Sequence, residues 1–268
     1  MTMDTAQVVL MRQRPAGIEV LLLRRQSAGF SFPGGAVDGN EDFRVAAARV
    51  LFEDTGILLA RGGAELAATL ETPSLPSLRK KILAGANATA TLRAAGFTWA
   101  SEALLQWSQW ISPSATGLSS PGIRIDTAGS TSIRLFIAEQ PAGMQPSFAK
   151  DEAVESKWIL AGDAELHADE LLLSPHAIRT LWELRNFDKL KDVFASGRTR
   201  ATEPHAILPR MSANFTLLLP WDPDYETQGQ GEALPFDYHP KWAHGPSRFV
   251  REDRTWKLIA SRDSTPKG

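Results

Sequence analysis

The sequence predicts an α/β fold in which amphipathic helices cover a sheet. Two runs rich in Val and Leu, 7–12 and 19–24, flank a Pro-Ala-Gly turn and are typical of paired strands. A glycine-rich loop at 32–41 leads into a helical pattern of apolar residues over 42–55. Strict apolar alternation at 131–139 indicates a further strand. With 268 residues, the chain can bury a sizeable core as one large domain.

The glycine loop and the helix that follows it have locally specified ends. Gly34, Gly35 and Gly39 allow the loop backbone to take positive φ values and to approach a ligand closely. Asn40 is expected to cap the helix, with acidic residues in the first turn, where they suit the helix dipole. Gly56 stands just past the last helical residue, the usual place for a left-handed stop.

Two adjacent carboxylates, Glu53 and Asp54, lie near the C-terminal end of this helix. The helix dipole disfavours negative charge there, so the helix itself does not explain them. A bound cation would explain them, since Mg²⁺ is usually held by one or two carboxylates and completed by water and phosphate oxygens. Another face of the helix is apolar and should pack on the sheet. Its residues recur at three- and four-residue spacing and are Ala47, Ala48, Leu51 and Phe52.

This segment resembles the Nudix box, which is Gly, five residues, Glu, seven residues, then Arg-Glu-apolar-x-Glu-Glu-x-Gly-apolar. Eight positions over 23 residues fall in register, after a Phe-Pro-Gly-Gly run: Gly35, Glu41, Arg49, Leu51, Glu53, Asp54, Gly56 and Ile57. The resemblance implies a Nudix fold, an α/β/α sandwich around a mixed sheet. It also implies hydrolysis of a nucleoside diphosphate that is linked to another group.

The resemblance also implies roles for residues of the box. Glu53 and Asp54 match the glutamates that bind Mg²⁺ or Mn²⁺ in the family. Glu41 and Arg49 match the pair that orients the loop and the helix. The turn at Gly34 and Gly35 is expected to shape the phosphate site.

Two positions depart from the box. Asp54 replaces a Glu, which shortens one ligand arm but keeps its charge. Val50 replaces the first Glu of the Arg-Glu pair, and this removes a carboxylate one turn before the acidic pair. Fewer anionic oxygens predict weaker metal binding or one metal fewer. Two hypotheses follow: a metal-dependent diphosphatase, or a catalytically impaired Nudix module that binds a nucleotide or a protein partner.

A general base is expected from the acidic turn that enters the strand predicted at 154–160. In Nudix proteins an acidic residue from this neighbourhood often joins the metal or acts as the base. The resemblance therefore implies Glu152 or Glu155 as a catalytic residue, able to substitute for the carboxylate lost at Val50. The alternative is a solvated acidic flank of a hairpin.

Arg24 and Arg25 end the second predicted strand and face opposite ways. One of them could reach a substrate phosphate. The alternative is a solvated strand end.

The rest of the chain is divided into an insertion and an extension. The segment at about 58–129 is longer than a sheet connection needs and is interpreted as a helical insertion that could cap the active site. Within it, one helix or a broken helix pair, interrupted near 85–87, and a further short helix at 99–107 are expected. A helix is predicted from Ser174-Pro175 to about 187. An irregular C-terminal extension, about 204–268, is expected to pack through its aromatic residues and to end in a hairpin.

The wider arrangement is loosely similar to the Nudix subgroup that includes the peroxisomal coenzyme A diphosphatases. Its features are the long insertion, the Leu-Leu-Leu-Ser-Pro helix start and the later Ile-Leu-Pro-Arg run. The chain shows no clear coenzyme A signature upstream of the box and ends without a peroxisomal Ser-Lys-Leu signal. A small-molecule nucleoside diphosphate derivative, with a coenzyme A type among the candidates, is the expected ligand.

Composition excludes several classes of function. A net charge of −2 and an isoelectric point near 6.2 argue against a nucleic-acid binder, which normally shows a basic field. The absence of cysteine excludes disulfides, thiolate nucleophiles and cysteine metal sites. No apolar run is long enough to cross a bilayer, and 1–13 lacks the pattern of a signal peptide. A cytoplasmic protein that does not bind membranes is therefore expected.

Overall fold

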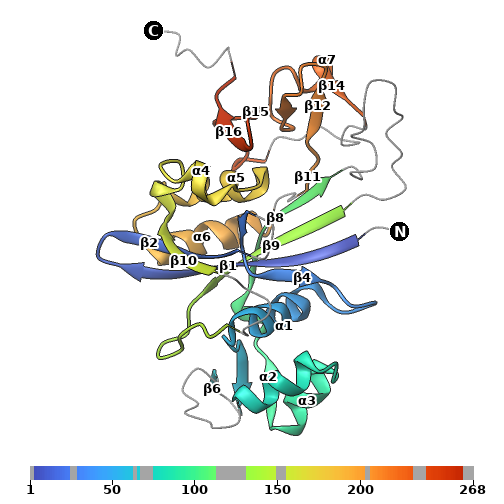
Figure 1. The fold of residues 1–268 in the computed structure, drawn as a ribbon, viewed down its shortest axis with the longest axis vertical. Coiled ribbons are helices and arrows are strands. Elements are labelled where there is room, and N and C mark those ends of the chain that lie inside the picture. The colour runs from blue at the N-terminus through green and yellow to red at the C-terminus, as the bar shows by residue number, and fades with distance from the viewer. Residues whose placement is uncertain are drawn as a thin grey trace.

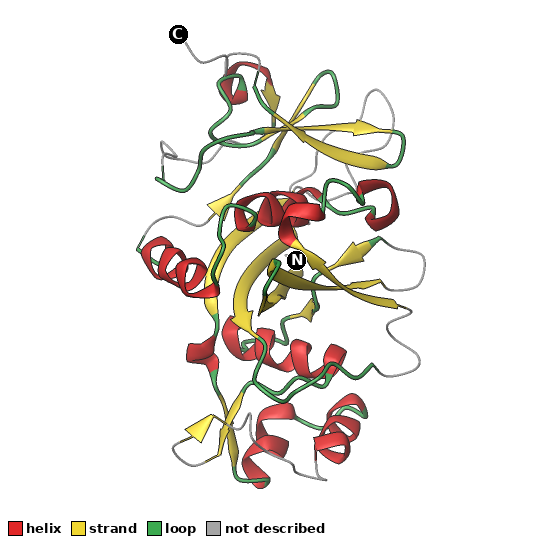
Figure 2. Ribbon diagram, turned by 90° about the vertical axis from the view of Figure 1, so that its left-hand side faces the viewer, coloured by secondary structure: helices red, strands yellow, loops and turns green. Residues whose placement is uncertain are grey.

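A computed structural model describes residues 3–24, 29–62, 65–66, 75–112, 131–148, 155–202, 206–231 and 240–261 of the chain. A mixed sheet lies between two helical layers, which confirms the expected α/β/α sandwich (Figures 1 and 2). The strands of this sheet are β1 (Met3–Arg14), β2 (Gly17–Arg24), β3 (Phe30–Ser31), β4 (Gly34–Ala36), β8 (Leu105–Ser112), β9 (Thr131–Glu139), β10 (Glu155–Leu160) and β11 (Ala206–Ile207). Their order is β10-β2-β1-β9-β8-β11, with β3 paired to β2 and β4 paired to β1.

The central strand β1 is buried on both faces. Ala6, Val8 and Leu10 pack on the side of helix α1 (Phe43–Thr55). Val9 and Met11 pack on the opposite side, where α5 (Pro175–Leu184) and α6 (Leu190–Arg200) lie. All five side chains have no exposed surface, which explains why this strand shows a continuous apolar run and no alternation. β1 pairs in parallel with β9 and antiparallel with β2, so the sheet is mixed.

The N-cap of helix α1 lies two residues later than the sequence analysis predicts. Asn40 is not its cap, because a turn in which the Glu41 amide donates to Asp38 O places Asn40 before the helix. Asp42 is the cap, and its Oδ1 accepts from the Arg44 amide at 2.9 Å. The C-terminal stop is confirmed, since Gly56 has φ 70° and donates to Phe52 O.

A small unit beside α1 contains a broken helix pair, which is one of the two alternatives that the sequence predicts. Helices α2 (Leu75–Leu83) and α3 (Ala88–Ala94) are separated near Gly85, and Asn87 Oδ1 caps α3. The short helix predicted at 99–107 is wrong, because a 3₁₀ turn there is followed by strand β8. A β-bulge between Gln106 and Ser108 lets Trp107 and Trp110 both join the core on the α5 side. The three short strands of the unit are β5 (Ala60–Gly62), β6 (Glu65–Leu66) and β7 (Phe97–Trp99).

The C-terminal extension forms a second sheet above α5 (Figure 1). The predicted terminal hairpin is confirmed as β15 (Arg248–Glu252) and β16 (Thr255–Ile259).

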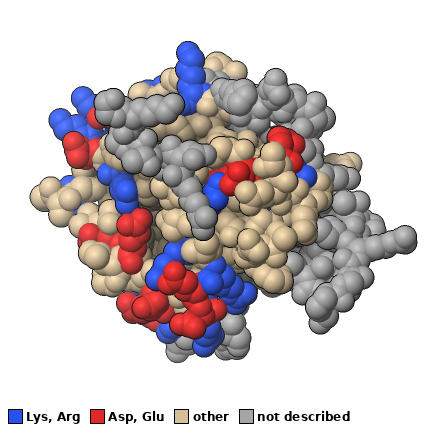
Figure 3. All heavy atoms as spheres, turned by 90° about the horizontal axis from the view of Figure 1, so that it is seen from above, with Lys and Arg blue, Asp and Glu red and all other residues tan. Residues whose placement is uncertain are grey.

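Lys, Arg, Asp and Glu side chains intermingle on the face seen from this end (Figure 3). The described helices include none that is both long and apolar enough for a bilayer. The remaining elements are α4 (Ala168–Leu171), β12 (Arg210–Ser212), β13 (Leu217–Leu218), α7 (Tyr225–Gln228), β14 (Gly229–Gln230), β15 (Arg248–Glu252) and β16 (Thr255–Ile259).

His176, in the first turn of α5, is half-buried against the sheet, where its ring also lies near that of Trp110. Gln7 Oε1 lies 3.1 Å from its Nε2, and Ser174 Oγ lies 3.1 Å from its Nδ1. Burial lowers the pKa of His176 from 6.5 to about 4. The folded protein therefore holds a neutral imidazole at a pH at which the unfolded chain would already bind a proton.

Acid is therefore expected to destabilise the fold through His176. Between pH 6.5 and about 4 the unfolded chain binds more protons, so the free energy of unfolding should fall by on the order of 3 kcal/mol as the pH drops across this range. Urea unfolding of wild type and His176→Asn at several pH values measures this, and the variant should show the shallower slope. His167→Asn, at an exposed histidine, is the control. Equal slopes in wild type and His176→Asn would contradict the assignment.

Candidate active site

Arg49 is the centre of the box segment. Its Nη2 donates to Glu41 Oε2 at 2.7 Å and to Ala36 O at 2.8 Å, while Nη1 lies 3.1 Å from Glu53 Oε2. Burial opposes the charge of the guanidinium, but hydrogen bonds and charge interactions with Glu41 and Glu53 outweigh it and hold the pKa of Arg49 above its ordinary value. One cation thus ties the glycine loop to the helix and fixes two of the predicted site carboxylates.

Asp54 fastens the start of the loop. The Gly34 amide donates to Asp54 Oδ2 at 2.8 Å, and the residue is 9% exposed. Gly34 itself is required by the close approach of β4 to β1, because a Cβ there would lie 2.7 Å from Ala6 O. The expected positive φ occurs in the loop only at Gly39, with φ 51°. Gly34 and Gly35 therefore serve close packing, and no left-handed turn is needed at either.

Glu53 and Val50 occupy the surface of α1 beneath this loop. The Glu53 side chain is 23% exposed, so it is paired with Arg49 without being closed to solvent. Partial burial raises the pKa of Glu53, Arg49 acts in the opposite direction, and Asp54 adds to the rise. Val50 is 3% exposed, and its Cγ1 would lie 3.2 Å from a Cβ placed on Gly35. An apolar side chain thus packs against the loop at the place where the box has a carboxylate.

The donor set suits one divalent ion better than a cluster. The described part of the chain contains no group of three or more His, Cys, Asp or Glu side chains that could hold a metal. Glu53 and Asp54 are adjacent carboxylates, which is the number that Mg²⁺ commonly takes from a protein when water and phosphate oxygens complete its shell. Two carboxylates are enough for a single ion that is shared with a phosphorylated substrate, and Glu53 and Asp54 stay its predicted ligands.

The predicted base and the predicted phosphate ligand lie opposite each other in the sheet. Glu155 of β10 is the register partner of Arg24 of β2, and their side chains form an ion pair. Lys157 Nζ also lies 3.6 Å from Glu155 Oε1. Glu152 and Arg25, the other two candidates, lie outside the described residues. Glu155 and Arg24 thus form an ion pair with each other in the structure. Their roles as general base and phosphate ligand stay predictions.

Sequence reasoning missed Arg79, which α2 of the insertion contributes to the end of the box helix. Its Nη2 and Nε donate to Glu53 O at 2.6 and 3.0 Å, and Nη1 donates to Ser147 O at 2.7 Å. A cation at a helix C-terminus satisfies end carbonyls and complements the dipole. The signal in the sequence was a basic Arg-Lys-Lys run, 79–81, within the predicted helical insertion. A pocket of about 480 Å³, lined in part by Phe52, Arg79 and Lys80, adjoins this contact.

Arg79→Met is expected to destabilise the protein by about 3 kcal/mol, because it leaves two carbonyl groups near the end of α1 without this donor. Equilibrium unfolding in urea measures the effect. Lys80→Met, at the exposed neighbouring position of the same helix, should change stability by no more than about 0.5 kcal/mol. Similar losses in the two variants would refute the capping role of Arg79.

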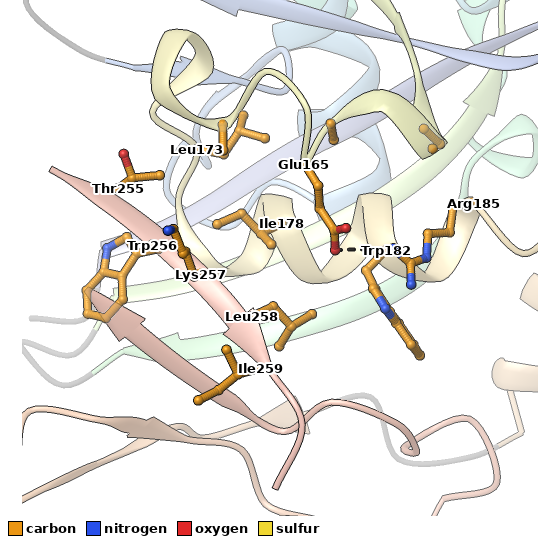
Figure 4. A pocket seen from close by; sticks show the side chains of 14 residues that line it. Glu165, Leu173, Ile178, Trp182, Arg185, Thr255, Trp256, Lys257, Leu258 and Ile259 are labelled. Carbon is orange, nitrogen blue, oxygen red and sulfur yellow. Dashed lines mark ion pairs between the residues drawn. The ribbon is translucent and has the colours of Figure 1, made fainter. Parts of the chain in front are cut away.

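An apolar pocket of about 310 Å³ lies elsewhere, between α5 and β16 (Figure 4). Ile178 and Leu258 contribute to its wall, and the ion pair of Glu165 with Arg185, at 3.2 Å, lies at its edge. Helix α5 covers the face of the sheet opposite α1. This pocket is therefore not part of the candidate active site.

Comparisons with known proteins point to the same family as the box. Residues 1–85 match the family model described as the NUDIX domain. A protein of Caenorhabditis elegans named "Putative nudix hydrolase 7" is 31% identical over 105 residues, which are 35% of this chain. The chain spans only about a third of the length of that relative, 34%.

Solved structures show the same fold. A NUDIX hydrolase from Alicyclobacillus acidocaldarius superposes with a TM-score of 0.59 at 21% identity, over 73% of this chain and 96% of that chain. A NUDIX domain of Shewanella oneidensis NrtR, complexed with ADP ribose, reaches a TM-score of 0.41 at 14% identity, over 69% of this chain and 88% of that chain. The family match over residues 1–85, the box in register and the likeness to the Alicyclobacillus structure together support a domain of the NUDIX family in this chain.

Proposed function

We propose that this protein hydrolyses a diphosphate linkage in a nucleoside-diphosphate-linked small molecule, with one Mg²⁺ or Mn²⁺ bound at Glu53 and Asp54. The observation that carries the proposal is the assembly around Arg49, which brings Glu41, Glu53 and the loop carbonyl of Ala36 to one guanidinium. The loop is thereby held against the helix that bears the acidic pair. Hydrolases of the NUDIX family generally use divalent ions, which supports the choice of cofactor.

The residues of this chain would have separate tasks in the reaction. A divalent ion, when bound, neutralises diphosphate oxygens and lowers the pKa of a water molecule. Glu53 would supply its most accessible ligand oxygens, since its side chain is 23% exposed. Asp54 would join it while holding the Gly34 amide, so that the loop which shapes the phosphate site stays in place. Glu152 or Glu155 would accept the proton of the attacking water.

The competing proposal is a Nudix module that binds a nucleotide without turning it over. The observation that favours it is Val50, whose packing against Gly35 removes one box carboxylate. The fit of two remaining carboxylates to one shared ion favours hydrolysis. A coenzyme A type substrate stays within the proposal, although the described residues show no feature specific to it.

A substrate panel decides between the two proposals. The full chain with Mn²⁺ is incubated with coenzyme A, a nucleotide sugar, a dinucleotide cofactor and a diadenosine polyphosphate, and nucleoside monophosphate release is measured. A catalyst should release a monophosphate from at least one of them, and EDTA should stop the release. Thermal stabilisation by one ligand without its consumption would instead establish a binding module.

A further inference from the structure

A buried cluster of three charges lies between α5 and α6, on the side of the sheet away from the box. Arg179 Nε lies 2.8 Å from Glu183 Oε1, and Arg200 Nη1 lies 2.9 Å from Glu183 Oε2. All three side chains are less than a tenth exposed. The two arginines pair with this one carboxylate and with no other among the described residues, so the cluster keeps an excess positive charge in a desolvated place.

Tryptophan rings stack with these arginines. The Arg200 guanidinium lies 3.6 Å from the ring centre of Trp107 and 4.7 Å from that of Trp242. The Arg179 guanidinium lies 4.5 Å from the ring centre of Trp182. Cation–π contacts of this kind stabilise the charge but do not neutralise it. The contacts join α5 and α6 to the C-terminal extension, so they build a rigid wall from segments far apart in the sequence.

A pocket of about 430 Å³ opens onto this wall. Its volume lies in the range of about 300–1,000 Å³ that is common for small-molecule sites. Among the described residues, flat rings and cationic groups dominate its lining, and Glu183, already held by two arginines, is the one carboxylate. The lining residues that matter here are Trp182, Phe187, Thr199, Arg200, Lys241 and Trp242.

Arg200 also presents a buried donor with no acceptor. Its Nε has no hydrogen-bond partner among the described residues, although the side chain is only 6% exposed. An unsatisfied N–H on a charged group is costly. The Nε atom itself is buried, but Arg200 lines the pocket, so an anionic oxygen bound there would balance the excess charge of the guanidinium.

We propose that this pocket binds a small molecule that carries an anionic group on a planar ring. The anionic group, a phosphate or a carboxylate, would meet Arg200, with Lys241 at the rim. The ring would stack against the tryptophans, which accept any flat π face. The site is separate from the box, because α5 and α6 lie on the opposite face of the sheet from α1.

The test titrates the full chain, in EDTA, with two probes by isothermal calorimetry. Adenosine 5′-monophosphate represents a ring with a phosphate, and 1-naphthoate represents a ring with a carboxylate. Binding of at least one probe supports the proposal, and the stronger of the two identifies the anionic group. If neither probe binds at concentrations up to about 5 mM, which corresponds to a binding free energy weaker than about −3 kcal/mol, the proposal is overturned.

Matched variants locate the binding. Lys241→Glu reverses a charge at the rim, and Thr199→Trp fills the pocket from an exposed position of α6. Each should weaken the bound probe by about tenfold or more. Lys191→Glu makes the same charge change on α6 outside this pocket and should leave the affinity unchanged.

Glu53→Gln separates this proposal from the proposed hydrolysis. If Glu53→Gln binds the probe with unchanged affinity and Thr199→Trp binds it more weakly, the probe lies in the pocket beside α5 and α6. The reverse pattern would place it at the box and overturn the inference. Neither result depends on whether the protein is a catalyst.

Discussion

Glu53→Gln is expected to abolish the Mn²⁺-dependent release of nucleoside monophosphate, with a loss of about 100-fold or more. The amide keeps the size of the side chain and can still accept from Arg49, so the fold should survive. It removes the negative charge that a divalent ion requires. The loss should therefore appear in kcat and in Mn²⁺ affinity together, measured by product release and by direct Mn²⁺ titration.

The control for this variant is Glu139→Gln, at an exposed end of β9. It makes the same chemical change away from the box and should leave turnover and Mn²⁺ affinity unchanged. Full activity in Glu53→Gln would remove Glu53 as a metal ligand. Lost activity with unchanged Mn²⁺ affinity would assign it a role in the reaction but not in holding the ion.

Val50→Glu is expected to increase Mn²⁺ affinity and turnover, each by about tenfold or more, because it restores a third carboxylate. Position 50 lies one helical turn before Asp54 and directly beneath Gly35. A new charge at a site that is 3% exposed should destabilise the metal-free protein. Bound Mn²⁺ should reverse that loss, so the variant should gain more thermal stability from the ion than wild type does.

Val50→Gln distinguishes charge from shape. It has the length of Glu without the charge, so it should carry a similar packing cost and gain no activity. Equal gains from Gln and Glu would show that side-chain size at position 50, and not a missing ligand, limits the protein. Folded Val50→Glu without any gain in Mn²⁺ affinity would mean that position 50 does not face the metal.

The local structure of the box was predictable because its signals are short in range. A glycine stop with a left-handed φ, an apolar face at helical spacing and paired strands around a turn depend on residues close in sequence. The N-cap prediction failed by two residues because Asn40 and Asp42 have similar capping propensity. The turn that begins at Asp38 includes Asn40, so Asp42 caps the helix. The helix predicted at 99–107 failed because the chain there leaves strand β7, makes a 3₁₀ turn at 101–103 and enters strand β8 at Leu105.

The sequence by itself determined the α/β class, the register of the box and the loss of one carboxylate at Val50. Only the tertiary structure decided that Arg79 of the insertion satisfies Glu53 O, that Glu155 pairs with Arg24, and that Arg179 and Arg200 share one buried carboxylate. The reason is physical. Helix ends and apolar faces are set by interactions within a few residues. Ion pairs between residues far apart in the sequence form only when distant segments pack together and exclude water.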